Sequence, residues 1–291
     1  MSLDERTIAR QFSRAAGTYD AHAELQREVG ERLMERLEGI KFEPRTILDL
    51  GCGTGAQAQA LHARFPRATL LASDLSGAML KQARKRRGWL RKRFDLLQAN
   101  ARALPLAEES LDLVFCNLML QWCDDPAQVF AGLRRALRPG GLLLVSTFGL
   151  DTLIELRRAW ASVDEAPHVG RFTDVQRLGS ALTRAGFAEP VLDTDWLTTT
   201  YARAGDLLKE LKGLGATHAD AHRARGLMPP SRLRAALAAY DTFRLEDGRV
   251  PATWEVVYAS AWAPDHGQPV RDGQGEVASI PISSLKVRRR E

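Results

Sequence analysis

The chain has 291 residues, enough for one domain with a large insertion or for two small domains. Its 45% hydrophobic and 26% charged residues are ordinary for a globular protein, and its net charge of +5 is modest. No apolar run approaches the roughly 18 residues that span a bilayer, and the charged start MSLDERTIARQF lacks the apolar centre of a signal peptide. We therefore expect no membrane association.

The first 42 residues show a helical pattern in which Leu25, Val29, Leu33 and Leu37 repeat every four residues. Short apolar strands then alternate with helices, which we expect at residues 56–65 and 77–87. The predicted strands lie in RTILDLGCGTG, ATLLASDLS, FDLLQANARALPL, SLDLVFCNLML and ALRPGGLLLVSTFG. This alternation predicts a parallel sheet with helices on both faces.

After residue 149 the pattern loosens. Helices are expected at residues 151–162 and 174–185, a strand in EPVLDTDWLTTTY, a mostly helical insert at 203–240, and a final strand in TWEVVYASAWAP. Because no crossover joins them, the last two strands predict an antiparallel pair at the sheet edge. The Gly/Gln/Ser/Arg-rich residues from about 265 predict a loosely held tail.

The three cysteines, Cys52, Cys116 and Cys123, have neither CxxC nor zinc-ligand spacing, so we expect reduced thiols, no bound metal and a cytoplasmic location. The positive charge is unevenly placed, since residues 81–93 carry basic residues and no acid. This basic run indicates either an acidic partner or a solvated helix face.

A glycine-rich loop, Asp49-Leu-Gly51-Cys-Gly53-Thr-Gly55, follows the first predicted strand and opens a helix. Its glycines let the backbone pass close to a ligand at the carboxyl ends of a parallel sheet. A dinucleotide-binding loop reads GxGxxG, whereas here the third glycine comes one residue early. The preceding acid suits a cationic ligand and would repel a pyrophosphate.

A second acid, Asp74, ends the next predicted strand about 20 residues later, where it can accept hydrogen bonds from two ribose hydroxyls. A cofactor with a ribose and a positive charge but no phosphate is S-adenosylmethionine. The alternative is that the three glycines only form a tight turn.

With ILDLGCGTG as its first motif, the chain resembles the class I methyltransferases. The resemblance implies a Rossmann-like α/β fold with a seven-stranded, mostly parallel sheet, an antiparallel edge strand and helices on both faces. It also implies that Asp49 and the glycines bind the methionine part of the cofactor and that Asp74 binds its ribose. Asn117 is then expected to line the floor of the site beside the reactive methyl group. The implied cofactor-binding residues are Asp49, Gly51, Cys52, Gly53, Gly55, Asp74, Leu75, Asn100, Ala101 and Asn117.

Three other stretches narrow the resemblance: FSRAAGTYDAHAELQ, NLMLQWCDDP, and a late segment that ends in TWEVVYASAWAP. Together they resemble the malonyl-acyl-carrier-protein O-methyltransferases of biotin synthesis, over residues from about 5 to 264. The resemblance implies methylation of the free carboxylate of a malonyl thioester on acyl-carrier protein or coenzyme A. It divides the chain into an N-terminal helical lid (1–42), a methyltransferase domain (43–264, with a helical insert at about 203–245) and a flexible basic tail (265–291).

The candidate catalytic residues are Tyr19, His22, Gln26 and Trp122. The first three fall at i, i+3 and i+7, so we expect them on one face of a helix that closes over the cofactor and substrate. Packing or a surface position is the alternative for Tyr19, His22 and Trp122. Arg223 and Arg225 are candidates for binding the substrate carboxylate or the phosphopantetheine arm, with exposed helix charges as the alternative.

Three rival functions remain. A trans-aconitate-type methyltransferase would share NLMLQW and methylate a small free acid, without the late segment. An RNA-modifying enzyme would suit the basic run, but only Trp89 and Phe94 interleave with it as aromatics, so we expect no nucleic-acid partner. A non-catalytic relative would keep the fold as an assembly factor.

Overall fold

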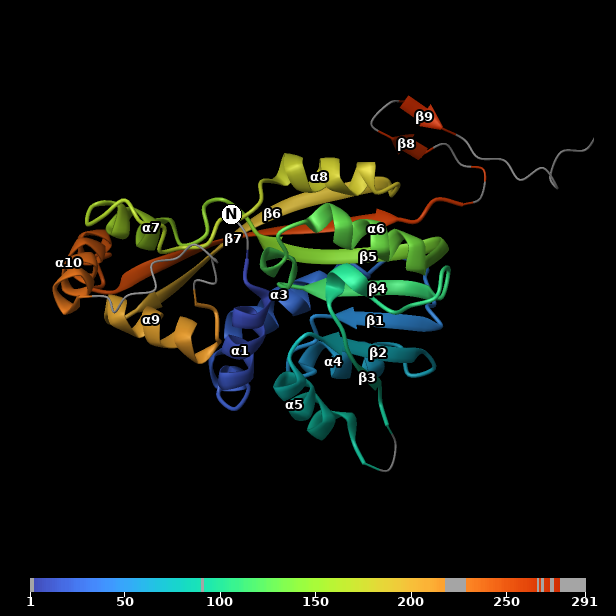
Figure 1. Ribbon diagram of the computed structural model, residues 1–291, viewed down its shortest axis with the longest axis horizontal. Coiled ribbons are helices and arrows are strands. Elements are labelled where there is room, and N and C mark those ends of the chain that lie inside the picture. Colours follow the sequence, from blue (N-terminus) through green and yellow to red (C-terminus); the bar gives the residue numbers. More distant parts are fainter. Residues whose placement is uncertain are drawn as a thin grey trace, which may run out of the picture.

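The computed structural model describes residues 3–89, 92–217, 229–265, 267, 270–272 and 275–277. Seven strands form one sheet in the order β3-β2-β1-β4-β5-β7-β6 (Figure 1). The strands are β1 (Thr46–Leu50), β2 (Thr69–Asp74), β3 (Asp95–Gln98), β4 (Leu111–Asn117), β5 (Leu137–Phe148), β6 (Ala188–Tyr201) and β7 (Val250–Trp262). The five strands from β3 to β5 are parallel, and β7 runs against both β5 and β6. The predicted fold is confirmed, with the reversed strand β7 lying one position in from the edge strand β6.

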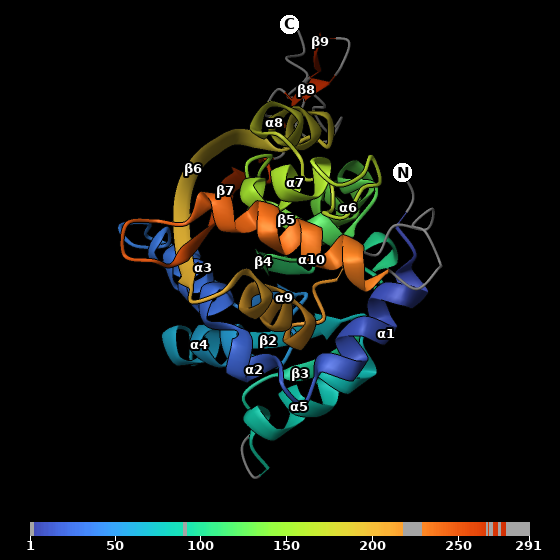
Figure 2. The same cartoon turned by 90° about the vertical axis from the view of Figure 1, so that its left-hand side faces the viewer.

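Alternation of side chains along the buried strands divides the core into two layers, because successive residues point to opposite faces of a sheet. Ile47 of β1 packs in the layer that contains α3 and α4, whereas Leu48 and Leu50 pack in the layer that contains α6 and α8. Figure 2 shows α3 and α4 on one side of the sheet and α6 on the other. The helices around the sheet are α4 (Ala56–Arg64), α5 (Gly77–Arg87), α6 (Pro126–Ala136), α7 (Ile154–Ala161), α8 (Val175–Arg184), α9 (Ala204–Gly213) and α10 (Pro230–Tyr240).

Side-chain caps fix where several helices begin. The Ser76 hydroxyl accepts from the backbone N–H of Met79 at 3.3 Å and starts α5 directly after β2. Asp125 caps α6, with Pro126 at its first position. Each cap satisfies backbone donors that have no partner within the helix. The α5 cap also places the start of this helix next to Asp74.

The N-terminal segment consists of three helices rather than the continuous helical face that the sequence predicts. They are α1 (Glu5–Ala15), α2 (Tyr19–His22) and α3 (Glu24–Glu35). The chain turns between α1 and α2, and Ala23, with φ −91° and ψ 35°, separates α2 from α3. The prediction that Tyr19, His22 and Gln26 share one helical face is therefore wrong, because helical spacing does not continue across the break.

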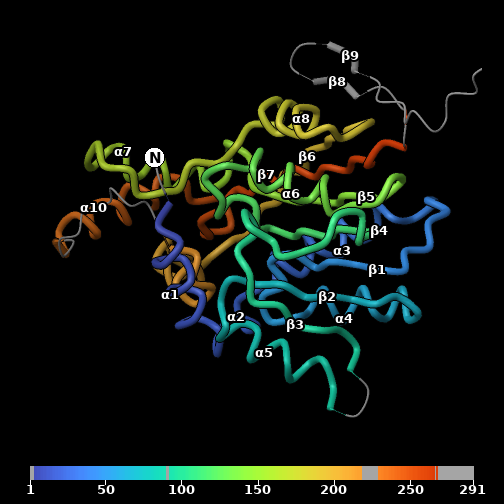
Figure 3. Tube along the Cα trace, turned by 45° about the vertical axis from the view of Figure 1, so that its right-hand side comes forward, coloured from blue at the N-terminus to red at the C-terminus, as the bar shows by residue number. Residues whose placement is uncertain are grey.

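The carboxyl ends of the parallel strands lie beneath a group of helices. Helices α1, α7, α9 and α10 gather at this end of the sheet (Figures 1 and 3). Gly215, just after α9, approaches α1 so closely that a Cβ there would lie 3.0 Å from the Gln11 carbonyl oxygen. The insert therefore packs against the N-terminal segment rather than standing apart from it.

The predicted flexible tail lies mostly outside the described residues. Within it, the structure describes a short antiparallel hairpin of β8 (Val270–Asp272) and β9 (Gly275–Val277). In the described part of the chain, no helix combines the length and apolar character that a membrane span needs.

Candidate active site

The glycine loop turns from β1 into α4 through three left-handed residues: Gly51 (φ 76°), Gly53 (φ 54°) and Gly55 (φ 82°). A residue with a side chain is strained in this left-handed conformation, whereas glycine adopts it readily, so the backbone at these three positions requires glycine. The N–H groups of Gly51 and Cys52 both donate to the Ser73 carbonyl, at 2.8 and 2.9 Å, and tie the loop to β2. A Cβ at Gly51 would lie 2.4 Å from Met119 Cγ, so the loop has neighbours on both sides.

The third glycine has a different surrounding. A Cβ at Gly55 would lie 3.0 Å from Ala83 Cβ and 3.3 Å from Phe94 Cζ. Gly55 precedes α4 and lines neither of the two cavities described below. The close packing of α4 against α5 therefore accounts for the glycine at this position, and contact with a ligand does not.

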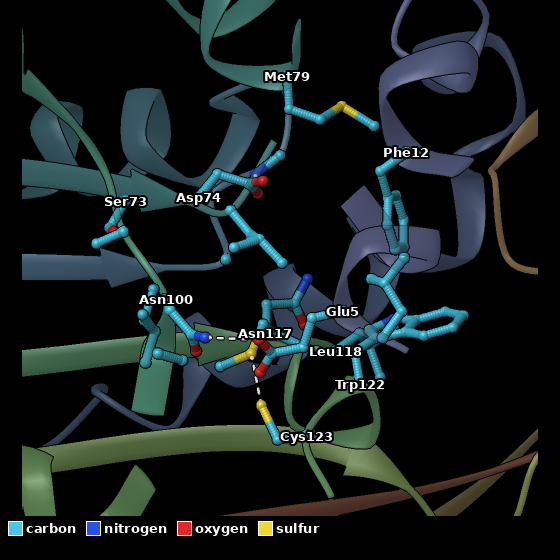
Figure 4. A pocket seen from close by; sticks show the side chains of 18 of the residues that line it. Glu5, Phe12, Ser73, Asp74, Met79, Asn100, Asn117, Leu118, Trp122 and Cys123 are labelled. Atoms are coloured by element: carbon cyan, nitrogen blue, oxygen red, sulfur yellow. Dashed lines mark hydrogen bonds between the residues drawn. The ribbon is translucent and has the colours of Figure 1, made fainter. Parts of the chain in front are cut away.

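One cavity, here the Asp74 cavity, lies between the glycine loop, the ends of β2 and β4, and helix α1 (Figure 4). Its empty volume, which includes space open to solvent, is about 770 Å³. Its lining includes the predicted residues Tyr19, Gly51, Gly53, Asp74, Leu75, Asn100, Ala101, Asn117 and Trp122. Sequence reasoning thus identified about half of the residues around this cavity.

Each carboxylate oxygen of Asp74 accepts one backbone hydrogen bond. The donors are the N–H of Gly53, at 2.9 Å, and the N–H of Ser76, at 2.7 Å. Burial raises the pKa of Asp74, and these backbone donors oppose the rise. A carboxylate oxygen accepts more than one hydrogen bond, so both oxygens can still receive hydroxyl donors from a ligand.

A second cavity, here the Asp49 cavity, lies on the other side of the loop and has an empty volume of about 660 Å³, part of it open to solvent. The two cavities adjoin, since both are lined by Tyr19, Gly51, Gly53 and Asn117. Cys52 also lines the Asp49 cavity, and burial raises the pKa of its thiol, which therefore stays protonated.

Two buried acceptors of the Asp49 cavity have no donor among the described residues. They are Asp49 Oδ2 and Gln26 Oε1. Burial, followed by the charge of Asp74, raises the pKa of Asp49 to about 7. Buried polar atoms normally have hydrogen-bond partners, so this pair indicates a site for a ligand with several donors and a positive charge.

The end of β4 joins the sheet to the N-terminal segment. Asn117 Nδ2 donates to the Gln26 carbonyl at 2.9 Å, and Asn117 Oδ1 accepts from Ser146 Oγ at 2.7 Å. Leu118 follows with φ 47°, a conformation that costs about 1–3 kcal/mol in a residue other than glycine. Such strain at the floor of a cavity is common at functional sites.

Contacts between distant residues hold the N-terminal segment over the Asp74 cavity. Glu5 accepts from Asn100 Nδ2 at 2.9 Å and forms an ion pair with Arg102. The Phe12 and Trp122 rings meet edge to face, with centroids 5.1 Å apart (Figure 4). Trp122 is thus a wall residue that also contacts the segment above it.

The four candidate catalytic residues do not all face the cavities. Tyr19 lines both of them, Gln26 lines the Asp49 cavity and Trp122 lines the Asp74 cavity. His22 instead packs against α9, where a Cβ at Gly213 would lie 2.3 Å from His22 Cδ2. Burial and the nearby Asp74 and Asp20 raise the pKa of Tyr19, so its hydroxyl stays protonated and can act as a hydrogen-bond donor.

Several lining residues were missed from the sequence, among them Asp20, which joins the N-terminal segment to the glycine loop and to α5. Asp20 Oδ1 accepts from Thr54 Oγ1, and Asp20 Oδ2 from Arg86 Nη2, both at 2.6 Å. Its position next to Tyr19 was the only signal available. The predicted substrate residues Arg223 and Arg225 lie outside the described residues.

Comparisons with known proteins agree with this geometry. A family model described as a methyltransferase domain matches residues 48–145. The malonyl-[acyl-carrier protein] O-methyltransferase of Xylella fastidiosa is 47% identical over 99% of this chain and 98% of its own length. The chain belongs to this family. The enzyme of that name from Halorhodospira halophila is 45% identical, with the same coverage of both chains.

Solved structures share the fold of this malonyl-[acyl-carrier protein] O-methyltransferase family member. The YcgJ protein of Bacillus subtilis superposes with a TM-score of 0.59 at 14% identity, covering 81% of this chain and 99% of its own. Phosphoethanolamine N-methyltransferase 2 of Haemonchus contortus, solved with S-adenosyl-L-methionine, gives 0.55 at 15% identity, covering 87% and 57%.

The chain is a methyltransferase that uses S-adenosylmethionine, and its two cavities fit this cofactor. The unpartnered acceptors of the Asp49 cavity suit an ammonium group, and the Asp74 carboxylate suits the two hydroxyls of a ribose. Among the described residues, no group of three or more His, Cys, Asp or Glu side chains is arranged to hold a metal.

Proposed function

We propose that this chain transfers the methyl group of S-adenosylmethionine to the free carboxylate of a malonyl thioester carried by acyl-carrier protein. The observation that carries the proposal is 47% identity over 99% of the chain to a protein of that name. The alternative, a trans-aconitate-type enzyme, is not favoured, because the curated relatives that match over nearly the whole chain carry the malonyl name.

Asp49 and the glycine loop would hold the methionine part of the cofactor, with its ammonium on Asp49 Oδ2 and Gln26 Oε1. Asp74 would accept the two ribose hydroxyls. Leu75, Asn100 and Ala101, which line the same cavity, would surround the adenine. The cofactor would then pass from one cavity to the other beneath Tyr19.

The chemistry asks mainly for positioning. A malonyl carboxylate is ionised at neutral pH and needs no general base, and the bound sulfonium supplies a methyl group that is already activated. The protein must align the carboxylate oxygen, the methyl carbon and the sulfur at contacts of about 3 Å and exclude water. Tyr19 and Asn117 line both cavities, Gln26 lines the Asp49 cavity and Trp122 lines the Asp74 cavity, and together they would perform this task.

The N-terminal segment would act as a lid. It covers the cofactor site through Glu5, Phe12 and Asp20, each of which contacts a residue of the sheet domain. Opening would break two ion pairs, an aromatic contact and the hydrogen bonds of Glu5 with Asn100 and of Asp20 with Thr54. The ion pairs lie on partly exposed side chains, so each of them costs little. A lid held in this way can open for exchange of product and cofactor.

The basic end of α5 would dock the acidic carrier protein. Arg86 and Arg87 are paired with Asp20 and Asp95, whereas Arg84 and Lys85 are exposed and Trp89 is 90% exposed. Complementary charge mainly raises the rate of association and weakens with salt. Arg223 and Arg225 remain candidates for binding the substrate carboxylate. Malonyl-coenzyme A is a candidate for a second methyl acceptor, and we expect the enzyme to be cytoplasmic.

The test is methyl transfer to malonyl-, succinyl- and acetyl-acyl-carrier protein, with malonyl-coenzyme A and trans-aconitate alongside, measured by mass spectrometry. We expect a gain of one methyl group on the malonyl thioesters. Methylation of trans-aconitate alone would transfer the function to the small-acid enzymes. The Asp74→Ala variant serves as the control for transfer that does not depend on the site.

A further inference from the structure

The Asp49 cavity carries charges of both signs. Its buried wall holds the two unpartnered acceptors, Asp49 Oδ2 and Gln26 Oε1. Two arginines also line it, Arg27, which is exposed, and Arg86, which is partly exposed. An α-amino acid carries an ammonium and a carboxylate on one carbon atom, so a cavity with acceptors inside and cations nearer solvent complements both groups. The methionine part of S-adenosylmethionine ends in such an amino acid.

Arg86 is already engaged by a carboxylate. Its Nη2 donates to Asp20 Oδ2 at 2.6 Å, and the other oxygen of Asp20 accepts from Thr54 Oγ1. The charges of Arg86 and Asp20 therefore offset each other. This ion pair links α2 to α5 and to the glycine loop. This structural role accounts for Arg86 without a ligand.

Arg27 has no such partner. Its Nη1 donates to the backbone carbonyl of Asp20 at 3.0 Å, and no ion pair joins it to a carboxylate in the described part of the chain. A neutral carbonyl does not cancel the charge of a guanidinium, and four of its five N–H donors remain available. Because Arg27 follows Gln26 on α3, its position is fixed by the helix that also supplies the Gln26 acceptor.

We propose that Arg27 binds the carboxylate of the methionine part of S-adenosylmethionine, while Asp49 and Gln26 bind its ammonium. A guanidinium is suited to this task because its planar donors match the two oxygens of a carboxylate. Arg27 lies on α3, which packs in the core of the sheet domain, and it also donates to the Asp20 carbonyl of α2, so recognition of the cofactor carboxylate is linked to the position of α2. The inference rests on the cofactor and not on the identity of the methyl acceptor.

The test compares two ligands that differ only in the carboxylate. S-adenosylhomocysteine carries it, and S-adenosyl-3-thiopropylamine is the same molecule without it. Affinities are measured by isothermal titration calorimetry on the full chain. Arg27→Gln should weaken binding of S-adenosylhomocysteine by roughly 10- to 100-fold, the range for a hydrogen bond between charged groups, and change binding of the amine less than twofold.

Arg32→Gln is the matched control, since Arg32 lies on the same helix and pairs with Glu28 and Asp195 away from the cavity. It should leave both affinities unchanged. Arg27→Lys keeps the charge and should restore part of the preference for the carboxylate. Equal losses for both ligands in Arg27→Gln, or no loss for either, would overturn the proposal, and melting temperatures show whether each variant is folded. Since no methyl acceptor is present, these results are independent of the proposed substrate.

Discussion

Cofactor binding should depend steeply on pH through Asp49. The residue is 1% exposed, its Oδ2 has no donor among the described residues, and burial together with the Asp74 charge raises its pKa to about 7. The ammonium of the bound cofactor favours the ionised carboxylate and lowers this pKa. Binding below pH 7 therefore requires loss of a proton from Asp49, so affinity rises with pH up to about 7 and then levels off.

The magnitude follows from the pKa. Each pH unit below the pKa of the cofactor-free protein reduces the ionised fraction about tenfold. With a pKa of about 7, the ionised fraction of Asp49 falls from about one half at pH 7 to about 1% at pH 5, so binding should weaken by about 50-fold if the bound state always holds an ionised Asp49. The same shift has a consequence for stability. A carboxyl whose pKa is raised by folding destabilises the cofactor-free protein as pH rises from about 4 to 7, because it must ionise while buried.

The assay is calorimetric titration with S-adenosylhomocysteine from pH 5 to 8, repeated at pH 6 in two buffers of different ionisation enthalpy. We expect release of nearly one proton on binding at pH 6 by the wild-type protein. Asp49→Asn should bind more weakly at pH 8 and lose most of the pH dependence; any slope that remains belongs to Asp74, whose pKa is also raised. A flat profile in the wild-type protein, or an equal slope in Asp49→Asn, would refute the reasoning.

Three further changes test other parts of the site. Asp74→Ala should reduce cofactor affinity at least 100-fold, because two charge-assisted hydrogen bonds to the ribose are lost; unchanged affinity by calorimetry would remove Asp74 from the site. Tyr19→Phe should lower kcat without changing the melting temperature, and full activity would leave Tyr19 a packing residue. Gly51→Ala should cost about 1–3 kcal/mol through its φ of 76° and its contact with Met119, and should impair cofactor binding. Gly132→Ala, on α6 with no atom within 4 Å of the added Cβ, is its control and should be neutral or slightly stabilising in thermal melts.

The sequence determined the features that depend on neighbouring residues. Helix α5 (Gly77–Arg87) matches its predicted range, because a serine cap and an unbroken helical pattern lie within a dozen residues. The strand, glycine loop and helix around Asp49 were likewise readable, since the glycines fix the turn and the apolar run fixes the strand. Asp74 follows from the same logic, at the carboxyl end of the next strand.

The tertiary structure alone decided which residues meet across the chain. Glu5 and Asn100 are 95 positions apart and Asp20 and Arg86 are 66 apart, and no local periodicity connects either pair. The spacing of Tyr19 and His22 predicted a shared face, but the break at Ala23 and the contact with Gly213 placed His22 against α9. The fold brings Arg27 to the Asp49 cavity in the same way, because packing of the N-terminal segment on the sheet, rather than helical spacing, sets which side chains line the site.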